Sequence, residues 1–262
     1  MGATARDRRL KVRIMAILID VLKDQKRSEG ALRAETLSNA WESMTAPEIL
    51  RASIEEAFSG DITLSSSFGA DSAVLLHMVS QIDANLPVVF LDTDRHFFQT
   101  LQYRDELISR LGLTNLINLK ADPMEAQAED GKGTLWRSAP DQCCDLRKVR
   151  PLNKLMNGYG AWISGRKRHQ SATRTSLPIV EFDGKHFKVN PLASWDASEV
   201  DAYFATWDLP AHPLVAAGFP SIGCFTCTKP VAAGDDARSG RWAGTEKVEC
   251  GIHNPIFGGD GI

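Results

Sequence analysis

Five cysteines form the most informative pattern in the sequence. Cys143 and Cys144 are adjacent, Cys224 and Cys227 make a Cys-x-x-Cys pair, and Cys250 stands apart near the end of the chain. An odd number of cysteines argues against a framework of disulfides. Because four of the five lie in two tight pairs, the pattern indicates one shared metal site rather than four unrelated buried thiols.

The adjacent pair bears on which metal is bound. A single Zn²⁺ usually takes its thiolates from two Cys-x-x-Cys-like knuckles, and adjacent cysteines reach one ion only with strain. A 4Fe–4S cluster binds thiolates on separate irons, so it tolerates adjacent ligands better. The spacing favours an iron–sulfur cluster, with zinc or redox-active thiols as the alternatives.

Cys250 has the features of a nucleophile. It lies in the last 29 residues of the chain, which hold seven of the twenty glycines, so we expect an exposed thiol on a mobile arm. Lys247 and His253 are close enough in sequence to stabilise a thiolate. A thiol that meets first a substrate and then a second protein benefits from such an arm. The alternative is an inert leftover cysteine.

A serine-rich turn, Ser65-Ser-Ser-Phe-Gly-Ala-Asp-Ser72, lies where a predicted strand passes into a predicted helix. Small residues at a helix N-terminus let an anion approach backbone N–H groups, although the Gly-Lys-Ser/Thr end of a Walker A loop is absent. Leu91-Asp-Thr-Asp94 ends the next strand, at the edge where open α/β sheets bind ligands. A purely structural turn and an acidic cap are the alternatives.

Residues 147–174 are basic within an acidic chain, with eight Lys or Arg and no Asp or Glu, against a net charge of −3 overall. We expect the predicted helix 147–154 to present a solvated face. Gly165 to Ser171 follows a predicted strand, and Arg side chains there suit phosphate or sulfate oxygens. This favours a small polyanionic ligand over nucleic acid, because no aromatic stacking pattern accompanies the charges.

These residues need a parallel sheet to bring them together. Short apolar runs at 62–67, 87–91, 116–119 and 161–164 alternate with helical patterns at 70–79 and 100–111, which predicts an α/β fold with a mostly parallel central sheet flanked by helices. We also expect a hairpin over 179–189 turning at Asp183-Gly184 and a helix from Asp196 to about Trp207.

Composition excludes several classes of protein. The 262 residues are 43% hydrophobic and 24% charged, as in ordinary globular domains, and the net charge gives no basis for binding nucleic acid or an anionic membrane. No uncharged apolar run reaches the roughly 18 residues of a transmembrane helix. The run Ile14–Ile19 has no cleavage site after it, so we interpret it as part of an amphipathic helix and expect a cytoplasmic protein.

Together these motifs resemble the sulfonucleotide reductases, specifically the bacterial adenylylsulfate (APS) reductases that carry a 4Fe–4S cluster. The resemblance covers about Asp61 to His253. Its most specific elements are Cys143-Cys144, the segment Ser221–Pro230 and Glu249-Cys-Gly-Ile-His253. The serine-rich turn resembles the Ser-Gly-Gly-x-Asp-Ser loop of PP-loop nucleotide enzymes, with Phe68 in place of the first glycine.

The resemblance implies the PP-loop (adenine nucleotide alpha hydrolase-like) architecture with a flexible C-terminal arm. We expect a helical segment over 1–60, a nucleotide-binding α/β domain with the cluster over 61–233, and an arm with the catalytic cysteine over 234–262. The implied activity is thioredoxin-dependent reduction of APS to sulfite and AMP through a cysteine S-sulfonate, in sulfate assimilation and cysteine biosynthesis. A glutaredoxin-like reductant and a homo-oligomer stay open.

Carried over residue by residue, the family pattern makes Cys143, Cys144, Cys224 and Cys227 the cluster ligands and Cys250 the nucleophile. Lys148 matches a lysine of the family that lies beside the cluster and the substrate. The residues implied to bind substrate are Ser66, Ser67, Phe68, Gly69, Leu91, Thr93, Lys148, Gly165, Arg166, Arg168, Arg238, Arg241 and His253. Two positions depart from the family: Asp94 replaces a glycine, and Lys167 replaces the first arginine of a pair.

Three alternatives remain at the level of sequence. A phosphoadenylylsulfate (PAPS) reductase differs by one ribose phosphate in its substrate, but such enzymes usually lack both cysteine pairs. An ATP-using PP-loop enzyme that thiolates tRNA fits the loop but not the Cys250 motif. An iron–sulfur or zinc regulatory module has no use for a nucleotide loop or an exposed thiol.

Overall fold

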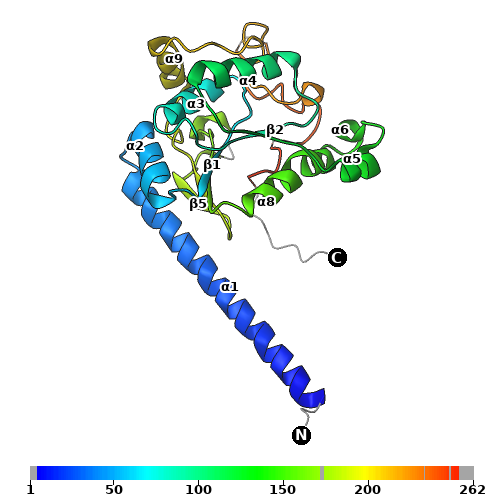
Figure 1. Ribbon diagram of the computed structural model, residues 1–262. Coiled ribbons are helices and arrows are strands. Elements are labelled where there is room, and N and C mark those ends of the chain that lie inside the picture. The colour runs from blue at the N-terminus through cyan, green and yellow to red at the C-terminus, as the bar shows by residue number, and fades with distance from the viewer. Residues whose placement is uncertain (1–4, 172–173, 233, 248, 254–262) are drawn as a thin grey trace.

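The structure is a computed structural model that describes residues 5–171, 174–232, 234–247 and 249–253. Its first element, α1 (Ala5–Trp41), is one continuous helix of 37 residues. The helix projects away from the body of the molecule and joins it only near its C-terminal end (Figure 1). There Ala34 and Trp41 are buried in the main core, whereas Met15 and Leu18 are exposed. The helical N-terminal segment predicted from the sequence is therefore present.

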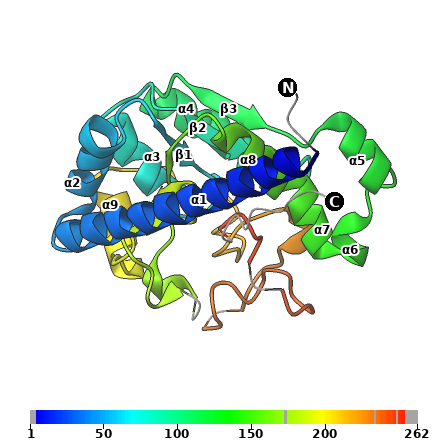
Figure 2. The same ribbon diagram turned by 90° about the horizontal axis from the view of Figure 1, so that it is seen from below.

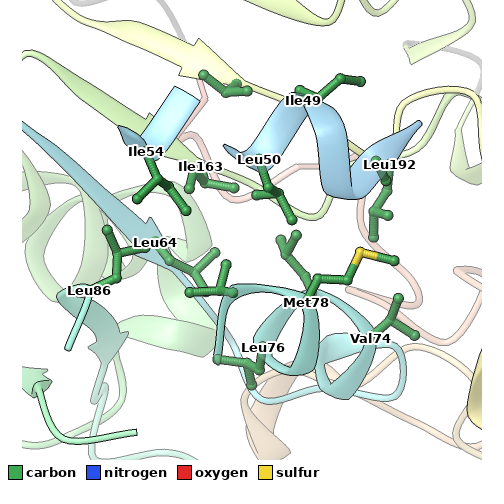
Figure 3. Close-up of a cluster of buried hydrophobic side chains, with 14 of the residues drawn as sticks. Ile49, Leu50, Ile54, Leu64, Val74, Leu76, Met78, Leu86, Ile163 and Leu192 are labelled. Atoms are coloured by element: carbon green, nitrogen blue, oxygen red, sulfur yellow. The ribbon is translucent and has the colours of Figure 1, made fainter. Parts of the chain in front are cut away.

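A capped helix follows and connects α1 to the sheet. In α2 (Ala46–Arg51) the Glu48 carboxylate accepts a hydrogen bond from the Thr45 N–H at 2.7 Å, which closes one side of a capping box. The chain then continues into the π-helix η1 (Ala52–Ala57). Ile49 and Leu50 of α2 lie against Leu192, and Ile54 of η1 lies near Leu64 of the first strand (Figure 3).

Six strands form one sheet in the order β3-β2-β1-β4-β6-β5. The strands are β1 (Ile62–Ser65), β2 (Val88–Leu91), β3 (Leu116–Leu119), β4 (Ala161–Ile163), β5 (Val180–Phe182) and β6 (Phe187–Val189). All neighbouring pairs are parallel except β5 and β6, which form the antiparallel hairpin expected at Asp183-Gly184. The mostly parallel sheet predicted from the sequence is confirmed.

The helices cover both faces of this sheet. They are α3 (Ser72–Ser80), α4 (Phe98–Leu111), α5 (Pro123–Asp130), α6 (Leu135–Ser138), α7 (Pro140–Cys144), α8 (Arg150–Met156) and α9 (Ala197–Thr206), with short turns η2 (Asp145–Val149), η3 (Arg168–Gln170) and η5 (Phe225–Cys227). Asp196 caps α9 by accepting the Glu199 N–H at 2.9 Å, as its sequence predicts. Figure 2 shows α2, α3 and α9 on one side of the sheet, with α8 and the group α5–α7 on the other.

The pleat of the strands divides the apolar side chains between two cores. Val88 and Phe90 of β2 join the main core with α2, α3 and α4, whereas Val89 and Leu91 of the same strand join a smaller core under α8. In β4, Trp162 faces the smaller core. This second core carries the cysteine-bearing segment on one side of the sheet.

Residues 123–156 differ from the sequence-based expectation. The short helices α5, α6 and α7 have no clear apolar period and were not predicted, and the basic segment 147–154 is not a solvated helical face. Its first member, Arg147, is 7% exposed and lies in the π-helix η2. The buried partner Asp130, from a different element, explains why this charge faces inward.

Within the described part of the chain, no helix combines the length and the hydropathy needed to cross a membrane.

Candidate active site

The serine-rich turn after β1 forms one wall of a cavity of about 540 Å³ at the carboxyl edge of the sheet. Ser66, Ser67 and Gly69 line this wall, and α3 begins directly after it at Ser72. The Ser66 Oγ accepts a hydrogen bond from the Phe68 N–H at 3.2 Å, which tightens the turn. A helix N-terminus beside small residues favours a bound anion.

Phe68, which replaces a glycine of the PP-loop, and Asp94, which replaces a glycine of the reductase pattern, both adopt left-handed backbone. Phe68 has φ +49° and Asp94 has φ +57°. This conformation is costly for any residue with a Cβ atom. The Phe68 ring is fully buried against Phe90, at 5.5 Å between centroids, so its packing offsets the strain. The local geometry of the family loop therefore survives without its glycine.

The structure brings most of the sequence-predicted substrate residues to this one cavity. They come from the ends of β1, β2 and β4, from η2 and from the C-terminal segment. The predicted residues that line it are Ser66, Ser67, Gly69, Leu91, Lys148, Gly165, Arg166, Arg238, Arg241, Cys250 and His253. The parallel sheet produces this grouping because the carboxyl ends of its strands meet at one edge.

Three of the predicted residues do not line the cavity. Phe68 points into the main core, and only its backbone belongs to the turn. Thr93 lies on the cysteine side, with its Oγ1 3.2 Å from the Cys224 Sγ. Arg168 points away and forms a two-pronged contact with Glu42, at 2.8 and 3.1 Å.

Acidic side chains from distant segments neutralise the basic cluster. Arg166 pairs with Glu181 of β5, and Lys167, whose side chain is almost completely buried, lies 2.7 Å from Asp71 of the serine-rich turn. Burial, together with the nearby Arg174, lowers the pKa of Arg166 despite its acidic partner. Several side chains of the contiguous basic stretch are thus paired with acids in space, whereas Lys148 belongs to none of the ion pairs among the described residues.

Among the lining residues that sequence reasoning did not assign to the site are Trp162, Lys167, Gln170, Arg174 and Glu249. Lys167, Gln170 and Arg174 lie inside the basic stretch, which was the available signal. Glu249 was visible only as part of the Cys250 motif. Nothing in the sequence distinguishes Trp162 from an ordinary core residue.

The segment around Cys250 lies across the cavity. Glu249 accepts two hydrogen bonds from Arg174, at 2.9 and 2.6 Å, and lies 3.2 Å from Arg238. On the other side, the His253 ring stacks on Trp162. Cys250 between them is half-buried rather than fully exposed, and it lines the same cavity as the serine-rich turn.

The other four cysteines converge beside this site. Cys143 and Cys144 at the end of α7 line a small, mostly apolar cavity together with Cys224 and Cys227 of η5. Among the described residues none of these thiols is part of a disulfide. Burial raises the pKa of Cys144 to about 11. Burial also opposes the charge of Cys224, but the Lys148 ammonium and the Thr93 hydroxyl lower the pKa of this thiol.

Three residues separate the two cavities and line both of them, namely Lys148, Arg241 and Trp242. Burial opposes the charge of Lys148, but its electrostatic interactions with the side chains of Cys224, Cys250 and Cys144 raise its pKa above the usual lysine range. Lys148 therefore lies between the paired cysteines and the lone one. Lys247 pairs with Asp141, and burial lowers the pKa of His253 well below its usual value, so the stabilisation of Cys250 by these two residues stays a prediction.

The paired cysteines are the side chains that could hold a metal cofactor. No group of three or more His, Cys, Asp or Glu side chains among the described residues converges closely enough to hold a single metal ion. The four cysteines nevertheless share one cavity whose polar lining is mainly their own sulfur and basic side chains. Thiolate donors that surround a common space without meeting at one point fit a multinuclear iron–sulfur cluster better than one zinc ion.

An open, mostly parallel sheet with an anion loop after β1 and ligand residues at its carboxyl edge defines an α/β nucleotide-binding enzyme. Comparison with known proteins narrows this class. Residues 61–230 match the family model described as "Phosphoadenosine phosphosulfate reductase domain". The chain belongs to this family.

Relatives agree on the family and include both substrate names. The chain is 48% identical over 223 residues to a protein of Mesorhizobium japonicum named adenosine 5′-phosphosulfate reductase, covering 85% of this chain and 88% of the relative. It is 41% identical to a phosphoadenosine 5′-phosphosulfate reductase of Gloeobacter violaceus, and the match covers 84% of this chain and 92% of that relative. The crystal structure of the Candida auris PAPS reductase superposes with a TM-score of 0.63 at 26% identity. The match covers 76% of this chain and 96% of the Candida auris chain.

Proposed function

We propose that this protein reduces adenosine 5′-phosphosulfate to sulfite and AMP, with thioredoxin or a similar dithiol protein as the electron donor. The observation that carries the proposal is the position of Cys250. Its thiol lies in one cavity with the serine-rich turn and several basic side chains, Lys148 among them. A nucleophilic thiol in a basic nucleotide cavity suits transfer of a sulfonyl group.

Substrate binding uses the edge of the sheet. The backbone of the serine-rich turn and the N-terminus of α3 would receive the nucleotide, with Gly165 allowing close approach after β4. Arg238 and Arg241 lie on the segment that covers the cavity and would contact the phosphosulfate. The substrate anion would then replace the Glu249 carboxylate near Arg174.

The chemistry proceeds in two displacements that balance. The Cys250 thiolate attacks the sulfur of the phosphosulfate, the bond from sulfur to the phosphate oxygen breaks, and AMP leaves with the bonding pair. The product is a Cys250 S-sulfonate. A thiolate of the reduced dithiol protein then attacks Cys250 Sγ, releases sulfite and forms a mixed disulfide, which the second thiol of the donor resolves.

Positive charge is needed at the first step, because a thiolate approaches a group that already bears negative charge. Lys148 would supply a cation on the wall of the cavity, and Arg241 lies on the same wall. Preorganised cations of this kind stabilise the negative charge that develops on the leaving phosphate and sulfate oxygens.

The paired cysteines Cys143, Cys144, Cys224 and Cys227 would hold a 4Fe–4S cluster. When bound, the cluster would supply a charged, polarisable neighbour to Lys148 rather than electrons, because the donor dithiol provides both electrons of the reduction. Residues of this chain would position it: Thr93 faces the Cys224 Sγ at 3.2 Å, and Lys148 contacts the same sulfur.

The preference for APS over PAPS rests on the cysteine quartet and on the named relatives, of which the more similar one reported above is an APS reductase. A PAPS reductase is the second candidate, because the Gloeobacter relative carries that name. An ATP-dependent PP-loop activity is disfavoured by Cys250 in the cavity. The division at residues 60 and 233, a mobile arm beyond it, a homo-oligomer and a cytoplasmic location remain predictions.

The proposal is tested with purified protein. The purified protein should be coloured, and iron and sulfide analysis should give about four irons per chain. With reduced thioredoxin, it should release sulfite from APS much faster than from PAPS. A Cys250→Ser variant should lose sulfite release and S-sulfonate formation but keep the visible absorption. Turnover by that variant, or no SO₃ adduct at Cys250 in the native protein, would rule out the mechanism.

A further inference from the structure

The residues that follow Cys250 are fixed to the sheet through an aromatic contact. The His253 imidazole stacks on the Trp162 indole, with 5.0 Å between ring centroids and 9° between the planes. Trp162 is the middle residue of β4 and is buried in the smaller core, against which Ile252 also packs. A stacked pair of this geometry adds stabilisation beyond the buried area alone.

A buried lysine completes the contact from the neighbouring strand. Lys188 of β6 lies opposite Trp162 in the parallel register, and its Nζ donates a hydrogen bond to the His253 carbonyl at 3.0 Å. The same Nζ lies 3.3 Å from Asp183 Oδ2, and the Lys188 side chain is only 3% exposed. Because a buried ammonium is costly unless its hydrogen bonds are made, the contact with the His253 carbonyl stabilises the closed segment.

The contacts on the two sides of Cys250 differ in kind. On the N-terminal side, Glu249 is held by Arg174 and Arg238, which line the nucleotide cavity and would be needed by an anionic substrate. On the C-terminal side, Lys188 and Asp183 lie outside the lining of that cavity. Trp162 and His253 border the cavity, but substrate binding competes directly with the Glu249 contacts and not with the hydrogen bond from Lys188 to the His253 carbonyl.

We propose that Trp162 and Lys188 form a dock for His253, and that both are positioning residues for Cys250. The inference rests on the proposed function in that Cys250 is the nucleophile. The dock keeps the C-terminal side of Cys250 over the cavity when substrate displaces Glu249, so that the thiol reaches the sulfur from a fixed direction. Positioning of this kind acts on the rate of the chemical step more than on substrate affinity.

The first test compares Lys188→Met with Lys185→Met, a matched change at an exposed lysine on the same hairpin. Alkylation of Cys250 by iodoacetamide, followed by peptide mass spectrometry without nucleotide, reports how well the segment is held. Loss of the charged hydrogen bond should make alkylation about tenfold faster in Lys188→Met and leave Lys185→Met unchanged. Lys188→Arg should restore slow alkylation in part.

The second test measures the chemical step. In single-turnover assays with APS, Lys188→Met should form the Cys250 S-sulfonate about tenfold more slowly at saturating substrate, with little change in KM. Because Lys188→Met leaves Asp183 buried without its cation, His253→Ala serves as a second variant that leaves both strands intact. It removes the stacked ring and should give the same rise in the alkylation rate; it is not used for KM, because His253 also lines the nucleotide cavity.

The outcomes separate the dock from the enzyme activity. Equal alkylation rates in Lys188→Met, His253→Ala and the native protein would overturn the dock, and so would slower sulfonation without faster alkylation. If APS fails to modify Cys250 in the native protein, the proposed function fails, whereas the alkylation comparison still decides whether the dock exists.

Discussion

The Glu249 carboxylate accepts a hydrogen bond from Arg174 Nη2 at 2.6 Å, one residue before the proposed nucleophile. Both residues line the cavity that we assign to the nucleotide. The carboxylate of Glu249 binds the Arg174 guanidinium, which the phosphosulfate of a bound substrate would also need. Closing of this segment and binding of substrate are therefore coupled through the guanidinium of Arg174, with Arg238 3.2 Å from the same carboxylate.

Glu249→Gln tests this coupling. The amide keeps the size of the side chain but removes its charge, so an incoming phosphate no longer competes with a carboxylate for Arg174. We expect the Kd for AMP, measured by calorimetry, to fall by about threefold to tenfold, which is the range for loss of one competing charged hydrogen bond. The exposed neighbour Glu246 provides the control in Glu246→Gln. Unchanged or weaker AMP binding by Glu249→Gln would contradict the coupling.

Lys148→Met tests the cation between the two cavities. The change keeps the length of the side chain and removes the charge beside Cys250 and Cys224. We expect kcat/KM for APS to fall by about 10²- to 10³-fold, as for other preorganised groups that stabilise a transition state. The iron content is measured alongside. Lys154→Met, at an exposed position of α8, should change neither kcat/KM nor the iron content. A fall of less than threefold in the kcat/KM of Lys148→Met would exclude a catalytic role for Lys148.

Asp130→Ala tests the buried support of the cysteine-bearing segment. Asp130 Oδ2 lies 2.8 Å from Arg147 Nη2, and both side chains are at most 9% exposed. Removing one member leaves the other charge buried, which costs about 3–5 kcal/mol in the free energy of unfolding. Its neighbour Glu129 pairs with Arg150 at the surface, at 2.6 Å. Glu129→Ala should lower the free energy of unfolding, measured with urea, by at most about 1 kcal/mol. Equal effects of Asp130→Ala and Glu129→Ala would refute a special role of the buried Asp130–Arg147 pair.

His212 predicts a dependence of stability on pH. Burial lowers the pKa of His212 from 6.5 to about 4. In the folded state its Nδ1 accepts the Leu214 N–H and its Nε2 lies 3.0 Å from Thr100 Oγ1, which fits a neutral ring. Between these two pKa values the unfolded chain binds a proton that the folded chain does not. The stabilisation is therefore complete above about pH 6.5 and is lost as the pH falls toward 4.

The measurement is urea unfolding at pH 7 and pH 5. The His212 contribution to the difference should be about 2 kcal/mol, and other buried histidines add to the total with the same sign. His212→Asn removes the titrating group, so its stability should fall less over the same interval. A pH dependence that is identical in the native protein and in His212→Asn would show that His212 does not contribute.

Local sequence patterns specified much of this molecule. The apolar run before Asp92, the turn at Asp183-Gly184 and the cap at Asp196 identified strand, hairpin and helix, because each depends on neighbours in the chain. The cysteine spacing predicted a shared site, and Cys143 and Cys144 do line one cavity with Cys224 and Cys227.

What the sequence could not decide depends on partners far apart in the chain. The charge of Arg147 faces inward because Asp130 lies beside it, and the basic stretch pairs with acids such as Asp71 and Glu181. No local period records these contacts.

The sequence by itself thus determined the alternating α/β pattern, the two cysteine pairs and the separate thiol, because spacing and residue type carry that information. Only the tertiary structure decided that Lys148 separates the two cavities and that Trp162 and Lys188 hold the segment after Cys250. The physical reason is that the charge state and the contacts of a side chain depend on its burial in low-dielectric surroundings and on its neighbours. The folded sheet brings these neighbours together from distant parts of the chain.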